Sequence, residues 1–351
     1  MQQLKSALLG ALFILSCVYL PAQDQHFTQF YASPLNLNPA LTGAIEGTYR
    51  IGLNYRNQGK NPAEVPYTTT SAAVDLRVGL DNRRRVRRDK FGVGMVFYSD
   101  RNSFVNFFTN YIGVSGAFHK SLDKKSTQFL SLGFQYGVAQ TNISYDNFTF
   151  DDQFNGSNGF NLGTREVLPT NNFAYSDLAL GLNYAYTPNR GVGVYAGASM
   201  YHVMEPEVSF FTEAESPGTD NLYRRYTAHL SLSIPLTEYI QILPRALGYL
   251  QGPHTMLNGG TNLRFEFSND ENSALHIGGW GRFTTNAASG ISWDAAIGMV
   301  GIEYKNFLFG VSYDAKVLSF TAGGNPQSAL EFSFTYIGDY DNSLNSLCPG
   351  F

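Results

Sequence analysis

Residues 130–138 read L-S-L-G-F-Q-Y-G-V, and every second residue of this stretch is large and apolar. Side chains of a β-strand point alternately to the two faces of a sheet, so the leucines, the aromatic residues and the valine would share one face. Serine, glycine and glutamine would occupy the other face. This pattern is typical of a membrane-spanning β-barrel, although one strand of a soluble sandwich can show the same alternation.

The same alternation recurs along most of the chain and decides between these two folds. We predict strands at residues 47–57, 67–80, 90–101, 105–120, 126–145, 173–187, 190–204, 221–236, 238–250, 254–268, 272–285, 290–304, 305–317 and 326–339. An even number of strands brings both ends of a barrel to one side, which is periplasmic in bacterial barrels. The predicted fold class is therefore all-β, a transmembrane antiparallel β-barrel of about 14 strands.

The lengths of the predicted connections favour a membrane barrel. Residues 146–172 and 205–220 are the two longest connections, and both follow odd-numbered strands. Connections after even-numbered strands are mostly tight, as at 188–189, although 81–89 is longer. Short turns on the periplasmic side and long loops outside are the arrangement expected of such barrels.

The first 22 residues are predicted to be an export signal. Lys5 supplies the positive start, Ser6–Leu20 the apolar core, and Ala22 the small-residue end, so we expect cleavage near Ala22 or Gln23. A membrane helix is the alternative, but the apolar run is shorter than the ~20 residues that a span needs. A lipoprotein site at Cys17 is a further alternative, which the preceding residues match poorly.

Composition agrees with an exported barrel. Charged residues make up 15% of the chain, against roughly 25% in soluble domains. The net charge of −4 argues against a nucleic-acid partner. Cleavage of the signal would leave Cys348 as the single cysteine, which excludes an intramolecular disulfide.

Residues 23–46 do not alternate and form the predicted entry segment. Pro34–Gly43 reads P-L-N-L-N-P-A-L-T-G, which is too irregular for a helix and too rich in proline for a central strand. A barrel of this width needs a filled lumen or leaves a channel, so we expect the segment to cap or plug the lumen. The predicted organisation is a signal peptide at 1–22, the entry segment at 23–46, the barrel at 47–339 and a periplasmic tail at 340–351.

Three further groups of residues are candidates for sites. An arginine cluster is either a solvated turn or a docking patch for an acidic periplasmic partner; it comprises Arg83, Arg84, Arg85, Arg87 and Arg88. Acidic residues at 146, 151 and 152 match no calcium-loop spacing. The six histidines show no metal-ligand spacing and are interpreted as strand and turn residues.

Four stretches resemble the PorP/SprF family. The first is Gln23–Phe30, Q-D-Q-H-F-T-Q-F, and the second is Pro34–Gly43. The third is Tyr55–Gln58, Y-R-N-Q, where Gly59 stands in place of the family's usual tryptophan. The fourth is the ending Cys348–Phe351, which resembles the family's Cys-Pro-x-Phe.

Members of this family are outer-membrane proteins of the type IX secretion system. The resemblance implies a role in binding, exporting or anchoring cargo with a C-terminal sorting domain, such as a surface adhesin used in gliding. It implies cargo, other secretion-system proteins and outer-membrane lipid as partners, and no cofactor. Candidate residues for plug or partner contacts are Pro34, Asn36, Asn38, Pro39, Ala40, Gly43, Tyr55, Arg56 and Asn57.

Two other functions were weighed. Asn38-Pro39-Ala40 also resembles the N-P-A of the plugged fatty-acid channel family, which implies a channel for small hydrophobic molecules. An outer-membrane enzyme of the lipase type is the third possibility. No Ser-His-Asp order or carboxylate pair defines a catalytic site, so we do not predict an enzyme.

Overall fold

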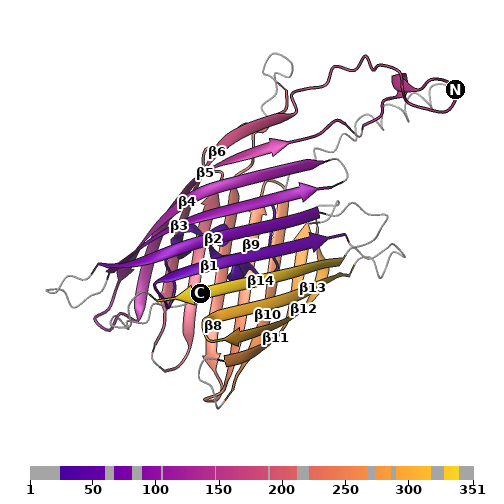
Figure 1. Ribbon diagram of the computed structural model, residues 1–351. Coiled ribbons are helices and arrows are strands. Elements are labelled where there is room, and N and C mark those ends of the chain that lie inside the picture. The colour runs from indigo at the N-terminus through magenta and orange to yellow at the C-terminus, as the bar shows by residue number, and fades with distance from the viewer. Residues whose placement is uncertain are drawn as a thin grey trace, which may run out of the picture.

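Within the described residues, fourteen antiparallel strands form one closed barrel in the computed structural model (Figure 1). Each strand pairs with its neighbours in sequence, and β1 closes the barrel against β14. The strands are β1 (Tyr49–Gln58), β2 (Tyr67–Leu80), β3 (Asp89–Asn102), β4 (Phe107–Ser121), β5 (Gln128–Asn142), β6 (Asn172–Tyr186), β7 (Gly193–Tyr201), β8 (Arg225–Pro235), β9 (Ile240–Gln251), β10 (His254–Glu266), β11 (Ser273–Thr285), β12 (Ile291–Tyr304), β13 (Phe307–Lys316) and β14 (Ser328–Gly338). The structure describes residues 24–59, 67–80, 89–103, 106–146, 148–188, 190–211, 221–267, 273–285, 290–317 and 328–339.

The predicted strands and fold class are confirmed, with small differences at the ends. Strand β7 ends at Tyr201 rather than near 204, because His202 has a φ of 57° and turns the chain out of the sheet. A left-handed conformation is incompatible with a continuing strand. Among the described residues, no helix has the length and hydrophobicity to cross a membrane.

The two faces of the barrel wall differ as the alternation predicted. Outward-facing Leu132, Phe134 and Tyr136 are 65%, 51% and 45% exposed, whereas inward-facing Ser131 and Gln135 are buried. Exposed apolar rows on a closed barrel suit contact with lipid tails, and a polar interior is the usual complement. The barrel wall is therefore a membrane-facing surface around a polar lumen.

The longest described connections project from one end of the barrel, here called the mouth. The connection 143–171 joins β5 to β6, contains the short helix η3 (Asp151–Gln153) and extends away from the barrel (Figure 1). The connection 202–224 joins β7 to β8 at the same end. Both follow odd-numbered strands, as predicted.

Residues 24–45, here called the lumen segment, lie against the inward-facing side chains of the strands. The segment includes three short helices, η1 (Phe30–Ala32), α2 (Pro34–Leu37) and η2 (Pro39–Leu41). Its N-terminal end meets β9 at the mouth, where the Asp24 N–H donates to Gln251 at 3.1 Å. Its far end meets β4, where Thr42 donates to Ser115 at 2.9 Å. The segment thus runs along the lumen from the mouth toward the opposite end before β1 begins.

Candidate functional site

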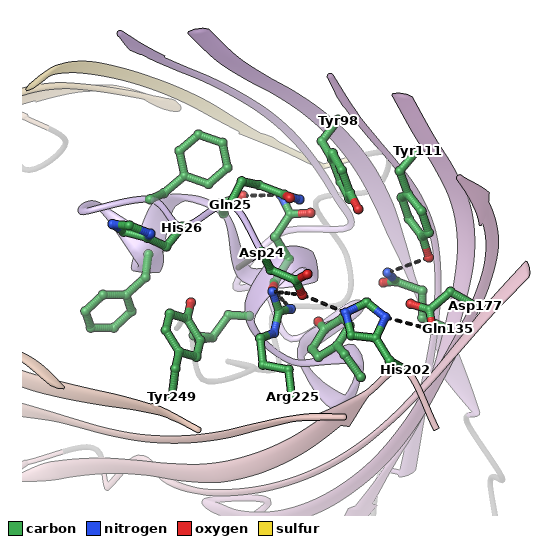
Figure 2. Close-up of a pocket in the computed structure, with 16 residues that line it drawn as sticks. Asp24, Gln25, His26, Tyr98, Tyr111, Gln135, Asp177, His202, Arg225 and Tyr249 are labelled. Carbon is green, nitrogen blue, oxygen red and sulfur yellow. Dashed lines mark hydrogen bonds and ion pairs between the residues drawn. The ribbon is translucent and has the colours of Figure 1, made fainter. Parts of the chain in front are cut away.

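An ionic clasp, here called the mouth clasp, holds the first described residue of the lumen segment (Figure 2). The Asp24 carboxylate lies 2.6 Å from His202 Nε2 and 2.8 Å from an Arg225 guanidinium nitrogen. His202 Nδ1 in turn lies 3.1 Å from the carboxylate of Asp177 on β6. The Gln251 amide donates to Asp24 at 3.2 Å. Residues at the ends of three strands, β7, β8 and β9, therefore converge on one carboxylate of the lumen segment.

The mouth clasp also sets the charge of its imidazole. Burial alone disfavours the imidazolium, but the carboxylates of Asp24 and Asp177 outweigh this and raise the pKa of His202 to about 9. Burial alone would also raise the pKa of Asp24, yet His202 and Arg225 hold it well below its usual value. Both partners are consequently charged at neutral pH, and the contact is a true ion pair.

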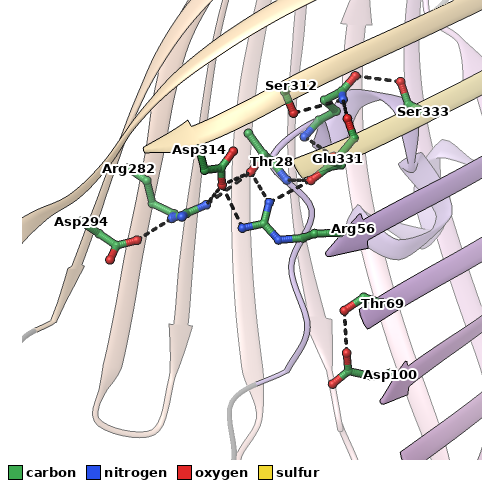
Figure 3. A network of polar contacts seen from close by, with 11 residues as sticks. Thr28, Arg56, Thr69, Asp100, Arg282, Asp294, Ser312, Asp314, Glu331 and Ser333 are labelled. Carbon is green, nitrogen blue, oxygen red and sulfur yellow. Dashed lines mark hydrogen bonds and ion pairs between the residues drawn. The ribbon is translucent and has the colours of Figure 1, made fainter. Parts of the chain in front are cut away.

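A second cluster, here called the β1–β14 clasp, lies across the seam that closes the barrel (Figure 3). The Arg56 guanidinium lies 2.8 Å from Asp314 and 3.0 Å from Glu331, and all three side chains are at most 2% exposed. Arg56 also donates to the Thr28 hydroxyl at 2.6 Å. The Glu331 carboxylate accepts the backbone N–H groups of Thr28 and Gln29, each at 2.8 Å. Glu331 on β14 thus binds the backbone of the lumen segment, whereas Arg56 on β1 and Asp314 on β13 bind the Thr28 hydroxyl.

Arg282 on β11 extends the β1–β14 clasp. It donates to Asp314 and to Asp294, each at 2.7 Å. The two arginines and three carboxylates therefore form one buried network in which every charge has a partner. Buried charges are tolerated only when they are paired in this way.

The middle of the lumen segment is fixed by Asn38. Its side-chain oxygen accepts the Ala40 N–H at 2.9 Å and caps η2. Its amide donates to the Leu182 carbonyl at 3.0 Å and the Ala198 carbonyl at 3.3 Å. One buried amide therefore shapes the segment and attaches it to β6 and β7.

Glycines on the inner wall let the lumen segment approach the strands closely. A Cβ on Gly133 would overlap the backbone of Pro39 and Ala40, and one on Gly181 would overlap the Asn38 side chain. These positions belong to the small-residue face that the alternation predicted. The wall of β5 and β6 is therefore shaped to the segment, because any side chain there would displace it.

Most of the candidate plug residues lie in this contact. Pro34 begins α2, and Asn36 donates to Ser71 on β2 at 2.7 Å. Gly43 has a φ of 73° and donates its N–H to Asp75 at 2.7 Å. Candidates Asn38, Pro39, Ala40 and Arg56 make the contacts given above.

The remaining candidates do not join them. Tyr55 points outward, is 40% exposed and packs against Phe332, so it does not contact the lumen segment. Asn57 lies near the mouth and donates only to the Tyr55 hydroxyl, at 3.4 Å. The arginine cluster at 83–88 lies outside the described residues.

Sequence reasoning missed several residues of the two clasps. Asp24, His202 and Arg225 lie far apart in the sequence, and His202 was interpreted, with the other histidines, as a strand or turn residue. Glu331 and Asp314 were visible as charged residues on the inward face of membrane strands. A charge at such a position needs an internal partner, and that is the signal that could have identified them.

The described residues offer space at the mouth but no metal site. A cavity of about 770 Å³ opens beside the first residues of the lumen segment, lined in part by Asp100, Asp294 and Lys316. No group of three or more His, Cys, Asp or Glu side chains in the described part of the chain could hold a metal ion.

Comparisons with known proteins agree with this architecture. The family described as "Type IX secretion system membrane protein PorP/SprF" matches residues 20–336. A FadL homologue from Pseudomonas aeruginosa superposes with a TM-score of 0.51 at 12% identity, covering 85% of this chain and 92% of that chain. The Pseudomonas putida toluene transporter TodX gives 0.47 at 10% identity, covering 90% and 98%. No curated protein matches the chain. At such identities the similarity to the FadL homologue shows the outer-membrane barrel fold alone.

Proposed function

Because the chain belongs to the PorP/SprF family of type IX secretion membrane proteins, we propose that it binds, exports or anchors secreted cargo at the mouth of an outer-membrane barrel. The cargo class is a protein with a C-terminal sorting domain, such as a surface adhesin. Residues 24–45 act as the plug that closes the lumen, and the mature chain begins after the export signal at 1–22. Contact with other secretion-system proteins completes the proposal.

The observation that carries this proposal is the way the lumen segment is held. Two buried ionic clasps and the Asn38 contacts attach it to strands on several sides of the barrel. The lumen segment packs so closely against glycines of β5 and β6 that a side chain at these positions would overlap it. A barrel filled in this way has little use as an open pore, so its function is expected at its surface.

The mouth supplies a surface suited to a protein partner. The connection 143–171 carries exposed apolar side chains that are not part of the lipid-facing rows of the strands. They are Phe154, Phe160, Leu162, Val167 and Leu168. Contiguous exposed apolar patches mark interaction sites, and Phe154 and Phe160 pack together here with ring centroids 5.2 Å apart. They support binding of cargo at the mouth.

The alternative function is a plugged channel for small hydrophobic molecules. One feature favours it: Tyr98, Tyr111, Tyr201 and Tyr249 line a small pocket beside the lumen segment (Figure 2). The pocket also contains the charges of the mouth clasp, which suit an apolar ligand poorly. The close fit of Asn38-Pro39-Ala40 to glycines of β5 and β6 likewise favours a permanent plug.

Deletion of the gene separates the two functions. Loss of sorting-domain cargo from the cell surface, with normal uptake of fatty acids and aromatic hydrocarbons, is the expected result. Restoration by the wild-type gene is the control. Normal cargo display with impaired uptake would overturn the proposal in favour of the channel. In planar bilayers the purified protein should show no steady conductance, and deletion of residues 24–45 should open it.

A further inference from the structure

Strand β6 has an open edge at the mouth. It pairs with β5 along its whole length, from Asn172 to Tyr186, but pairs with β7 only from Leu180 onward. One more bond follows, in which the Val203 N–H donates to the Leu178 carbonyl at 3.0 Å. Within the part of the chain that the structure describes, no strand pairs with residues 172–177 on the β7 side.

The edge is open because β7 is turned away at His202. The φ of 57° at this residue is uncommon for a side chain other than glycine and persists only where the surroundings enforce it. The mouth clasp enforces it by holding the imidazole between Asp24 and Asp177. Such enforced backbone conformations concentrate at functional positions.

Among the described residues, the chain at 204–211 makes no backbone hydrogen bond to β6, and the Phe210 carbonyl accepts the Thr170 hydroxyl at 2.8 Å, just before the strand begins. Phe210 packs edge-on against Phe173 at 4.8 Å between ring centroids, and against Phe107 at 6.3 Å. Both partners lie on the inward face of their strands. Within the described residues, the backbone groups of 172–177 that point toward β7 therefore have no backbone hydrogen-bond partner.

The edge presents backbone groups that could pair with an added strand. Because the Leu178 carbonyl points to the β7 side, the period of two places the N–H and C=O groups of Asn172, Ala174 and Ser176 on that side as well. The side chains at 174 and 176 are small, and Ala174 is exposed. Natural sheets protect such edges with proline, lysine, a bulge or an inward-pointing charge; Asp177 is such a charge at the end of the stretch, and no proline, lysine or bulge occurs at 172–177.

The flanking connections define the chemistry of the occupant. Their described residues carry six carboxylates, at 146, 151, 152, 166, 205 and 207, and two arginines, at 165 and 224. Val167 is 89% exposed, and Met204 and Phe211 are about half exposed. A segment that is extended, apolar and basic complements this surface.

We propose that an extended segment of the secreted cargo, apolar and positively charged, adds as a strand to β6 at Asn172–Ser176. The inference rests on the proposed function and specifies how the cargo is held. Backbone hydrogen bonds to Ala174 and Ser176 supply the affinity, and the acidic, apolar connections select the segment. His202 keeps the edge free by ending β7.

Paired proline and valine variants test the assignment. The double variant Ala174→Pro/Ser176→Pro removes both N–H donors at an edge where proline is tolerated. The matched control Ala174→Val/Ser176→Val keeps the donors and favours the strand. The probes are the purified C-terminal sorting domains of the type IX cargo proteins of the same bacterium, titrated against the full-length barrel in nanodiscs.

We expect the wild type and the valine variant to bind a sorting domain with similar affinity. Loss of two backbone hydrogen bonds should weaken binding to the proline variant by about 30-fold. In the wild type, amide hydrogen exchange at 174 and 176 should be fast in the free protein and slow in the complex. This second measurement decides the question even if the proline variant fails to fold.

Four outcomes would overturn the assignment. Binding to a folded proline variant within threefold of the wild type, or a complex without protection at 174 and 176, places the contact elsewhere and leaves the proposed function intact. Slow exchange at these amides in the free protein means that the edge is already occupied. Failure of every sorting domain to bind the wild type removes both the proposed function and the edge assignment.

Discussion

Replacing Arg56 by methionine tests how the lumen segment is held. The Arg56 guanidinium is 1% exposed and lies between Asp314 at 2.8 Å and Glu331 at 3.0 Å. Methionine has a similar length and no charge, so the change removes the ion pairs without opening a large cavity. Asp314 keeps Arg282 at 2.7 Å, and Glu331 is therefore the carboxylate left without a cation.

The magnitude follows from what Glu331 retains. Removing one partner of a buried ion pair costs about 3–5 kcal/mol. Because Glu331 still accepts the N–H groups of Thr28 and Gln29, the lower end applies. A loss of about 3 kcal/mol in the docking of the lumen segment corresponds to roughly 100-fold more frequent opening.

Hydrogen exchange at the amides of Thr28 and Gln29 measures this opening directly. We expect exchange roughly 100-fold faster in Arg56→Met. The matched control is Arg224→Met, whose ion pair with Glu205 is 42% exposed on both sides and should change exchange less than about threefold. Adding Glu331→Gln to Arg56→Met removes the unpaired charge and should recover part of the loss. An Arg56→Met effect no larger than that of the control would refute the reasoning.

Three further predictions use the same segment. Gly181→Ala places a methyl group on the Asn38 side chain and should speed exchange of the lumen segment about tenfold, whereas Gly279→Ala meets open space and should leave it unchanged. The pKa of His202 is raised from 6.5 to about 9, so its contribution to holding the segment is full below 6.5 and is lost as the pH rises through 9. Protection factors of the segment's amides, which remove the pH dependence of intrinsic exchange, should fall across this range in the wild type and stay constant in His202→Gln. Serine in place of the arginines at 83–88 should leave barrel assembly intact and abolish capture of an acidic periplasmic partner, and unchanged capture would remove that docking hypothesis.

The barrel could be predicted from sequence because lipid imposes a rule on every strand. Each outward position must be apolar, so the alternation is visible in each strand without knowledge of its neighbours. The run at 130–138 and the strand that ends near Tyr336 both show it. Strand ends were less certain because a single left-handed residue, His202, ends β7 early, and no local pattern predicts its φ.

The clasps could be predicted only in part. Arg56 entered the candidate list through a family resemblance, and its partners Asp314 and Glu331 lie more than 250 positions away. Pairing across a barrel seam depends on which strand closes against β1 and in what register, and the sequence gives no local signal for either. Tyr55 was wrongly included as a candidate for plug contacts because it precedes Arg56 in the same motif. Adjacent residues of a strand point to opposite faces, so Tyr55 faces outward while Arg56 faces the lumen.

His202 connects the position of the lumen segment to the shape of the mouth. The imidazole holds Asp24 at the start of the lumen segment, and its backbone ends β7 beside the open edge of β6. Buried ion pairs add little net stability, since desolvation offsets much of their attraction. The apolar side chains of the segment, such as Leu35 and Leu41, supply the burial. The mouth clasp therefore fixes the position of the lumen segment more than it adds stability. The same contacts end β7 at His202 and leave the β6 edge unpaired within the described residues.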